Sequence, residues 1–416
     1  MIIKSEQGIT DAELLEALKK SLEGKNLKKV LLLPPDHTRL YSGAGKICSM
    51  YYNLLKDTCE IDIMPALGTH EIMSEAECKM FFGDIPYEKF IAHNWKTDVV
   101  KLGEVPAEFV SEVSEGLVNN KIDVEVNKRL VSGEYDLIIS MGQVVPHEVV
   151  GMANYSKNIF VGCGGSSMIN SSHMLGAFYG MERIMGKDFS PVRKVFDYAE
   201  ENFIQNIPLM YVLTVTTNTG DDVHIHGLFI GRDRKLFEEA VSLSQEKNLN
   251  YLDKPLKKVV VYLDGREFKS TWLGNKSVYR TRMAIADGGE LIVLAPEVAK
   301  FGEDAENDRL IRKYGYVGRE RVLELVKENE DLANNLSTAA HLIHGSSDGR
   351  FNITYCTRKV TKEEVEGVNF KYIPYDEAAK KYDITKLKDG YNTVDGEEIF
   401  YISNPALGLW ATKDRI

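Results

Sequence analysis

The feature that most constrains the fold is an alternation of short apolar segments with amphipathic ones, which begins near the N-terminus. Residues 28–35, KKVLLLPP, form an apolar run that two prolines end, which is typical of a short buried strand. A helix is predicted before this run, with Thr10 or Asp11 as its cap and its end near Glu23. One strand and one helix of an α/β domain are therefore expected within the first 35 residues.

The same alternation recurs along the first half of the chain. Helices are predicted near residues 46–56 and 74–82, and strands in IDIMPALGTH (61–70) and YDLIISMG (135–142). Alternating strands and helices predict a doubly wound, mainly parallel sheet, hence the α/β class. Ligands bind such sheets beyond the carboxyl ends of the strands, where His37, His70 and His147 fall.

The length of the chain predicts two domains. Its 416 residues exceed the roughly 250–300 at which one hydrophobic core stops growing. A second α/β domain, smaller than the first, is expected to begin near residue 255, where LKKVVVYLDG (256–265) and GGELIVL (288–294) have the pattern of strands. We therefore predict domains 1–254 and 255–398, with 399–416 completing either one, and an active site in the cleft between them.

Composition excludes several classes of partner. Hydrophobic residues at 44% and charged residues at 27% are ordinary for a globular protein. A net charge of -11 argues against nucleic acid, and no apolar run reaches the length of a membrane span or of a signal peptide. Five cysteines without C-x-x-C spacing favour reduced thiols, so a cytoplasmic protein without nucleic-acid or membrane partners is expected.

Several short motifs resemble known sites but lack a residue that those sites require. SGAGKI (42–47) lacks the first glycine of a P-loop, because Leu40 stands there, and HEVVG lacks the second histidine of a zinc helix. No G-x-G-x-x-G follows the first strand, which argues against a nicotinamide dehydrogenase. The pairs His224/His226 and His341/His344 could each chelate a metal, but packing is the better interpretation without a carboxylate or cysteine cluster nearby.

The most informative stretch is residues 142–174, which places His147, Lys157 and His173 among glycines, serines and asparagines. Residues 162–167, GCGGSS, can present backbone N–H groups to a phosphate at a helix start, although an ordinary glycine turn explains the same letters. Neutral imidazole binds nickel, copper or zinc, and a lysine near such a loop can attach a cofactor. Each residue taken alone has an equally good structural explanation.

Together these landmarks resemble the nickel-dependent lactate racemase family, whose members carry a nickel-pincer nucleotide on a lysine. The resemblance covers most of the chain. Its motifs, in the family's order, are Asp36-His37-Thr38-Arg39, Gly68-Thr69-His70, Pro146-His147, Lys157 and His173.

The resemblance implies that Lys157 carries pyridinium-3-thioamide-5-thiocarboxylic acid mononucleotide, the nickel-pincer nucleotide, and that His173 is the protein ligand of nickel. His70 and His147 would be the paired acid–base residues. One takes the hydroxyl proton of a 2-hydroxyacid while hydride leaves C2 for the cofactor, and the other returns the proton after the 2-keto acid has reoriented. Maturation enzymes that make the cofactor are implied as partners. Contacts to the cofactor phosphate or the substrate carboxylate are implied for Asp36, Thr38, Arg39, Gly164, Gly165 and Ser166.

Two departures mark a divergent member. The family's Gly-Gly-Arg-Lys-Ser around the lysine is Tyr155-Ser156-Lys157-Asn158 here, and its Tyr-Gln-x-x-Lys segment is Tyr279-Arg280-Thr281-Arg282-Met283. The added guanidinium groups suit a substrate larger or more polar than lactate, such as an aldonate like gluconate or a dicarboxylic hydroxyacid. The alternatives are lactate itself, or a hydroxyacid-binding protein without catalysis. The residues expected to contact the substrate from this half of the chain are Trp272, Tyr279, Arg280 and Arg282.

Overall fold

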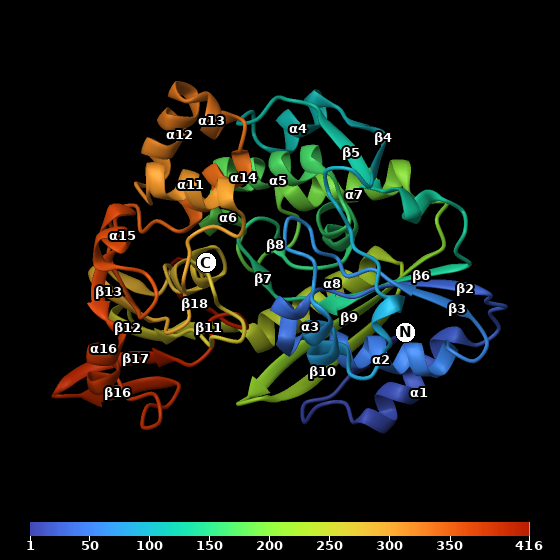
Figure 1. Cartoon of the computed structure of the whole chain (residues 1–416), viewed down its shortest axis with the longest axis horizontal. Helices are drawn as coiled ribbons and strands as arrows, with labels where there is room; N and C mark the ends of the chain where they lie inside the picture. Colours follow the sequence, from blue (N-terminus) through green and yellow to red (C-terminus); the bar gives the residue numbers. More distant parts are fainter. Residues whose placement is uncertain (416) are drawn as a thin grey trace. The chain divides into compact units, whose positions relative to one another are not determined.

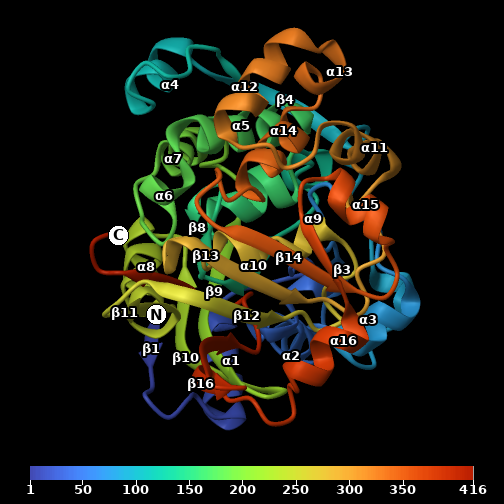
Figure 2. The ribbon, with the colours of Figure 1, turned by 90° about the vertical axis from the view of Figure 1, so that its left-hand side faces the viewer.

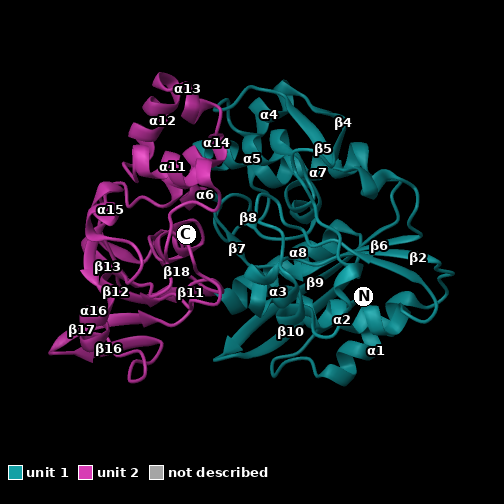
Figure 3. Ribbon diagram, in the orientation of Figure 1, with its two compact units in different colours: residues 1–179, 184–248 teal, residues 180–183, 249–416 magenta. Residues whose placement is uncertain are grey.

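The computed structural model describes residues 1–415 and divides the chain into two compact units, each built on its own sheet (Figure 1; Figure 3). Unit 1 comprises residues 1–179 and 184–248, and unit 2 comprises residues 180–183 and 249 onward. The change of unit after residue 248 lies a few residues before the predicted one at 254. The α/β class predicted from the alternation is confirmed in both units.

The sheet of unit 1 has the strand order β1-β10-β9-β6-β2-β3. Its parallel centre consists of β2 (Lys29–Leu33), β3 (Glu60–Ile63), β6 (Leu137–Gln143) and β9 (Leu209–Thr219). Two antiparallel strands, β10 (Asp222–Gly231) and β1 (Ile2–Lys4), complete one edge. The three strands predicted in this half of the chain are thus neighbours, in the order β6-β2-β3.

Helices cover the sheet of unit 1. Val30 and Leu32 of β2 belong to a core shared with helices α1, α2 and α3, whereas the intervening Leu31 and Leu33 are equally buried on the other face. A strand buried on both faces is typical of a doubly wound parallel sheet. The helices of unit 1 are α1 (Asp11–Leu22), α2 (Ala44–Leu55), α3 (Glu75–Phe82), α4 (Ala107–Val113), α5 (Ser166–Tyr179), α7 (Pro191–Phe203) and α8 (Arg234–Asn248).

Two of the three predicted helices begin with a capping box, whereas the helix predicted near residue 46 begins at Ala44 without a side-chain cap. The Thr10 side chain accepts a hydrogen bond from the Glu13 amide, and the Glu13 carboxylate accepts one from the Thr10 amide. Ser74 and Glu77 form the same reciprocal arrangement at the start of α3. Such capping boxes satisfy two backbone donors that a helix start otherwise leaves without partners. Within residues 1–415, no helix combines the length and the apolarity needed to cross a membrane.

Unit 1 also contains two short hairpin-like pairs. Strands β4 (Val99–Val105) and β5 (Ile122–Asn127) are antiparallel, as are β7 (Pro146–His147) and β8 (Gly151–Met152). Single helical turns lie at His37–Ser42, Tyr87–Lys89, Lys128–Val131 and Asn158–Gly162, the last a π-helical turn.

Unit 2 has a six-stranded sheet in the order β15-β14-β13-β12-β17-β16, and Figure 2 shows β12, β13 and β14 side by side. All neighbouring strands are parallel except β16 with β17. The strands are β12 (Leu256–Tyr262), β13 (Ile285–Leu294), β14 (Asn352–Thr357), β15 (Lys371–Pro374), β16 (Gly390–Val394) and β17 (Glu397–Ile402). The helices are α6 (Met181–Ile184), α9 (Thr271–Gly274), α10 (Lys276–Tyr279), α11 (Ala305–Tyr314), α12 (Arg319–Glu328), α13 (Glu330–Ala333), α14 (Leu336–His344), α15 (Lys362–Gly367) and α16 (Tyr375–Lys381).

The last residues of the chain belong to unit 2 and do not complete unit 1, which was the other possibility left open. Strand β17 pairs with β12, and β18 (Leu409–Thr412) pairs in parallel with β11 (Leu249–Leu252). Hydrophobic periodicity could not decide this point, because strand pairing is a long-range choice.

Candidate active site

The loops that follow β2 and β6 of unit 1 hold most of the candidate residues. Asp36, directly after β2, is 3% exposed and caps the next turn by accepting hydrogen bonds from the Thr38 amide (3.0 Å) and hydroxyl (2.5 Å). Its other oxygen accepts a hydrogen bond from His70 Nδ1 at 2.5 Å. Burial alone would raise the pKa of Asp36, but the charge and hydrogen bond of His70, with the bond from Thr38, hold it well below its ordinary value. Asp36 and Thr38 therefore orient His70, whereas a contact with a cofactor was expected of them.

The loop that carries His70 is attached to its neighbours through the backbone. The Ala66 amide donates to Pro34 O (2.8 Å), and the Gly68 amide donates to Gly162 O (2.9 Å). Gly68 has a φ of 57°, a left-handed conformation that glycine adopts without strain. Three loops that are distant in sequence, after β2, after β3 and around residue 162, are thus joined at one edge of the sheet.

The Nδ1 atom of His147 accepts a hydrogen bond, whereas that of His70 donates one. His147 is buried in the short β7–β8 pair, and its Nδ1 accepts the backbone N–H of Val149 at 3.1 Å. A ring nitrogen that accepts a backbone N–H carries no proton, so the neutral form of His147 has its hydrogen on Nε2. For His70, whose Nδ1 donates to Asp36, the neutral form leaves Nε2 with a lone pair.

Lys157 lies where the chain enters the π-helical turn after β8. The next residue, Asn158, anchors this turn by donating to Leu33 O of β2 (3.2 Å) and to Ser140 Oγ of β6 (2.9 Å). Among the described residues, the partly exposed Lys157 ammonium has no hydrogen-bond or ion-pair partner. Burial, and then the charge of Arg39, lower the pKa of Lys157 from its ordinary 10.5 to about 8. Its amine is therefore nucleophilic near neutral pH.

His173 points one ring nitrogen into its own helix. Its Nδ1 donates to Ile169 O, one turn earlier in α5, at 2.6 Å. Burial, together with the charge of Lys157, lowers the pKa of His173 to about 4. The ring is therefore neutral at physiological pH and keeps a lone pair on Nε2, the state that binds a transition metal.

These residues fit a cofactor that brings most of its own metal ligands. Among residues 1–415, no group of three or more His, Cys, Asp or Glu side chains could hold a metal ion unaided. One neutral imidazole, on His173, and one nucleophilic amine, on Lys157, are present in the same unit and interact through their charges. Such a donor set suits a group that attaches to the amine and carries its own sulfur ligands.

The glycine-rich loop before α5 differs from the expected phosphate site. The Ser167 amide donates to Glu125 Oε2 of β5 at 3.0 Å, and a Cβ at Gly165 would lie 2.3 Å from the same oxygen. Gly164 O accepts a hydrogen bond from buried His93 (3.1 Å). The chain's own carboxylate thus occupies the start of this helix, and the predicted phosphate contacts of Gly164, Gly165 and Ser166 would need Glu125 to move.

Arg39 has a guanidinium group that is available to bind an anion. It lies in the turn after Asp36 with a φ of -108° and a ψ of 43°, outside the helical region. No hydrogen bond to its guanidinium is formed within residues 1–415, although its charge affects both Lys157 and Asp36. A planar fork of free donors suits a carboxylate or a phosphate.

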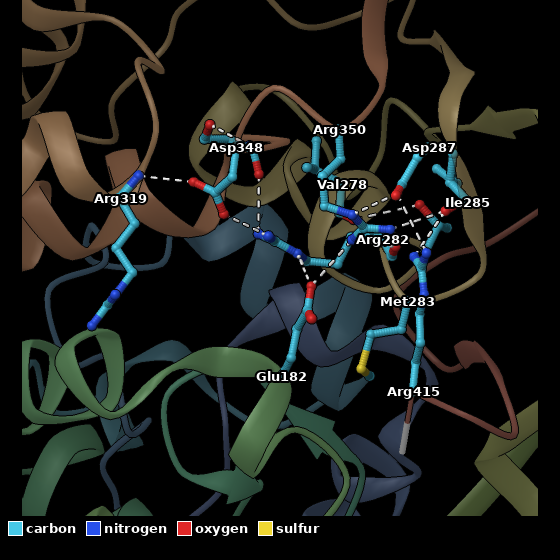
Figure 4. A network of polar contacts seen from close by, with 12 residues as sticks. Glu182, Val278, Arg282, Met283, Ile285, Asp287, Arg319, Asp348, Arg350 and Arg415 are labelled. Atoms are coloured by element: carbon cyan, nitrogen blue, oxygen red, sulfur yellow. Dashed lines mark hydrogen bonds and ion pairs between the residues drawn. The ribbon is translucent and has the colours of Figure 1, made fainter.

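In unit 2 the predicted substrate residues are engaged by the protein itself. Arg282 donates from Nε to Glu182 (2.8 Å) and from Nη2 to Asp348 (2.6 Å), and its Nη1 donates to Ser346 O (3.1 Å) (Figure 4). All three guanidinium nitrogens are therefore used, which is the structural reason against the predicted role of Arg282 in substrate binding.

The neighbours of Arg282 are also packed within unit 2. Arg280 is 2% exposed and donates to Gly408 O at 3.2 Å, and Tyr279 is buried at the end of α10. The Trp272 ring stacks on His341 with ring centroids 4.3 Å apart. Of the four residues that were expected to contact the substrate, Trp272 is partly exposed, whereas Tyr279, Arg280 and Arg282 are buried.

Comparison with known proteins identifies the first part of the chain. Residues 10–185 match the lactate racemase N-terminal domain. This part of the chain is therefore similar to the lactate racemase family, which indicates an isomerase of the racemase or epimerase type. No curated protein matches the chain.

Two solved structures share the fold of this chain. A Thermotoga maritima protein from a structural genomics consortium is 25% identical, with a TM-score of 0.84 over 99% of this chain and 100% of that one. The lactate racemase apoprotein of Thermoanaerobacterium thermosaccharolyticum is 18% identical, with a TM-score of 0.68 over 95% of this chain and 92% of that one. Both likenesses extend over the two units.

Sequence reasoning missed three residues that shape the family site in this chain: Glu125, Glu148 and Arg193. Glu125 caps α5, and the charge of Glu148 acts on both Lys157 and His173. Arg193 donates hydrogen bonds to residues in the segment 152–156. Glu125 and Arg193 act through contacts distant in sequence, so short motifs contain no signal for them.

The histidine pairs that were set aside have structural contacts. His226 bonds to Ser5 O (3.1 Å) and to the Thr217 hydroxyl (2.7 Å), and His341 bonds to the Tyr316 hydroxyl (2.9 Å). Packing is therefore the correct interpretation for these two residues.

Proposed function

We propose that this protein is a racemase or epimerase of a 2-hydroxyacid that uses a nickel-pincer nucleotide attached to Lys157. The observation that supports it most directly is the Lys157 amine, which has no partner among the described residues and a pKa lowered to about 8. A neutral amine is the form that acts as a nucleophile toward an acyl group. About a tenth of the amine is neutral at pH 7, against well under a thousandth for an ordinary lysine.

His173 would be the protein ligand of the nickel in this proposal. The pKa of His173, lowered to about 4, keeps the ring neutral, and the bond from Nδ1 to Ile169 O fixes the tautomer. A metal-binding histidine commonly has its second nitrogen bonded to a carbonyl in this way. The bound group supplies the hydride acceptor for C2 of the substrate.

The proton steps fall to His70 and His147. In their neutral forms His70 has a lone pair on Nε2 and His147 has a hydrogen there, so one is ready to accept a proton and the other to donate one. The hydrogen on C2 would leave and return as hydride, so the two histidines would handle the hydroxyl proton, one for each enantiomer. Asp36 stabilises the imidazolium that forms on His70, because its ionised carboxylate accepts the Nδ1 hydrogen.

Arg39 is proposed to bind an anion, either the substrate carboxylate or the cofactor phosphate. Its guanidinium is the one in unit 1 that affects the Lys157 charge and has no protein hydrogen bond among the described residues. A bidentate contact would fix the hydroxyacid relative to the two histidines.

The identity of the acid stays a prediction. The argument for an aldonate such as gluconate, or for a dicarboxylic hydroxyacid, depended on Arg280 and Arg282, and Arg282 donates from all three nitrogens within unit 2. A panel of lactate, malate, 2-hydroxyglutarate and gluconate, assayed for the change in optical rotation, tests it. Preference for lactate over every larger acid would contradict the larger substrate without affecting the reaction type.

The attachment is tested by intact-protein mass spectrometry after coexpression with the cofactor-making enzymes and nickel. We expect a persistent adduct that peptide mapping places on Lys157, with about one nickel per chain. Lys157→Arg is the matched variant, since it keeps the charge and removes the primary amine. No adduct and no nickel in the wild-type protein would contradict the proposal and favour a hydroxyacid-binding protein without catalysis.

A further inference from the structure

Two consecutive residues just before Lys157 have a left-handed backbone. Asn154 has a φ of 65° and Tyr155 a φ of 57°, and both are buried. Asparagine tolerates this region, but for a bulky side chain such as tyrosine it is an outlier that its surroundings must impose. The polypeptide therefore reaches Lys157 through a strained turn that something else in unit 1 holds in place.

Arg193 of α7 is the group that contacts this turn most extensively. Its side chain is fully buried, and Nη1 donates to Ser156 Oγ at 2.7 Å. Nη2 donates to Met152 O at 2.7 Å and to Asn154 O at 3.1 Å. One guanidinium thus binds three of the five residues that precede Lys157, on both sides of the left-handed pair.

The surroundings of Arg193 are unusual for a structural arginine. Its hydrogen bonds go to two carbonyls and a hydroxyl, while the rings of Phe237 and Phe196 lie 4.4 and 6.0 Å from Cζ. Burying a cation without a bonded carboxylate is unfavourable, and apolar side chains would fill such a core with less penalty. A rigid planar fork is, however, well suited to holding several carbonyls in a fixed geometry.

We propose that Arg193 is the positioning residue for Lys157: by holding residues 152–156 in their left-handed turn, it presents the amine for cofactor attachment. This inference rests on the proposed function of Lys157. It adds that the attachment site depends on a side chain 36 positions further along the chain, whose hydrogen bonds go to Met152, Asn154 and Ser156.

The electrostatic surroundings support the same arrangement. Burial is the main cause of the lowered pKa of Lys157, so a relaxed, hydrated loop would raise it, and losing the positive charge of Arg193 would raise it further. The charged groups that act on Lys157 are Arg39, Glu148, Arg193 and Asp36.

The test measures the amine of Lys157 directly in the protein without cofactor. At pH 8, N-hydroxysuccinimidyl acetate acetylates neutral lysine amines, forming an amide and releasing N-hydroxysuccinimide, and peptide mass spectrometry gives the rate at each lysine. Lys386, whose side chain is 82% exposed, is the internal reference. In Arg193→Met we expect the rate at Lys157 relative to Lys386 to fall about fivefold at pH 8, as for a rise of the pKa from about 8 by one unit. Arg193→Lys should lie between Arg193→Met and the wild type.

Arg234→Met is the matched control. Arg234 lies on helix α8, contacts the same Phe237 ring (5.0 Å) and bonds Asp188 and Asp197. Its guanidinium also lies 6.0 Å from the Tyr155 ring, but among the described residues it forms no hydrogen bond to residues 152–156. It should lower stability while leaving the labelling of Lys157 within about twofold of wild type. An equal fall in both arginine variants would show a general loss of packing and overturn the positioning role.

A glycine rescue separates positioning from stability. Adding Asn154→Gly to Arg193→Met removes the penalty of one left-handed residue, so part of the lost labelling should return, with Asn154→Gly alone as its background. If Arg193→Met does not fold, Ser156→Ala decides instead, because it removes only the Nη1 bond. Wild-type labelling in whichever variant folds would overturn the inference. A normal adduct on Lys157 would leave the proposed function intact even then.

Discussion

The segment around Lys157 in unit 1 and the segment Tyr279–Met283 in unit 2 both depart from the family pattern, but their cations are in opposite states. Lys157 and Arg39 have no hydrogen-bond partner among the described residues. Arg282 is bonded through every nitrogen, to Glu182, Asp348 and Ser346 O. A partly exposed cation that the fold leaves without a partner is available for a ligand, whereas a buried one that bonds the protein through every nitrogen serves the fold. An arginine is thus available for a ligand in unit 1, at Arg39, and serves the fold in unit 2, at Arg282.

The largest expected effect is on chemistry at Lys157. Lys157→Met should abolish the adduct and lower racemisation by at least about a thousandfold, because the nucleophilic amine is lost. Arg282→Met should keep the adduct, since its guanidinium is engaged elsewhere. Intact mass and optical rotation check both variants. Loss of the adduct in a folded Arg282→Met protein would break the comparison.

The second-largest expected effect is the decrease in kcat caused by Asp36→Asn. The amide can no longer accept the Nδ1 hydrogen as an anion, so the pair with His70 loses its charge stabilisation and its tautomer preference. We expect kcat to fall about a hundredfold or more, with the Lys157 adduct unchanged. Steady-state racemisation of adduct-loaded protein measures this. An unaltered kcat would show that His70 acts without Asp36.

Stability should change in opposite directions in the two segments. The pKa of Lys157 is lowered to about 8, so between pH 8 and 10.5 the unfolded chain binds a proton that the folded chain lacks. Stability therefore rises with pH across that window, and at pH 7 the Lys157 charge destabilises the fold. Lys157→Met should raise the free energy of unfolding at pH 7 by about 1–2 kcal/mol, since partial exposure reduces the full effect, with the gain gone by pH 10.5.

Arg282→Met should instead lower the free energy of unfolding by about 2–3 kcal/mol at pH 7, because Glu182 and Asp348 lose their partner. Denaturant titrations of both variants at pH 7 and at pH 10.5 give the comparison. Destabilisation by both substitutions at pH 7 would mean that Lys157 has a structural role after all.

The smallest effect is expected at Arg39. Arg39→Lys keeps the charge but replaces the planar fork, so KM should rise about tenfold with kcat changed less if the group binds the substrate carboxylate. An unchanged KM with weaker adduct retention would assign Arg39 to the cofactor phosphate. Initial rates over a range of hydroxyacid concentrations distinguish the two.

Local order was predictable because it depends on neighbours in sequence. The helix beginning at Thr10, the strand at residues 29–33 and the parallel neighbours at 60–63 and 137–143 follow from caps and hydrophobic periodicity. The order of His70, His147, Lys157 and His173 was also enough to indicate a similarity to the family whose N-terminal domain residues 10–185 match.

What the sequence determined by itself is thus the fold class, the similarity to the family and the list of chemically capable residues. Only the tertiary structure decided which of these residues have hydrogen-bond partners within the protein. Asp36 is bonded to His70, Glu125 occupies the start of α5 and Arg193 reaches back to residues 152–156, and none of these contacts has a short-range pattern. The physical reason is that a polar group's state depends on burial and on the atoms within hydrogen-bonding distance, and both are set by chain segments far apart in sequence.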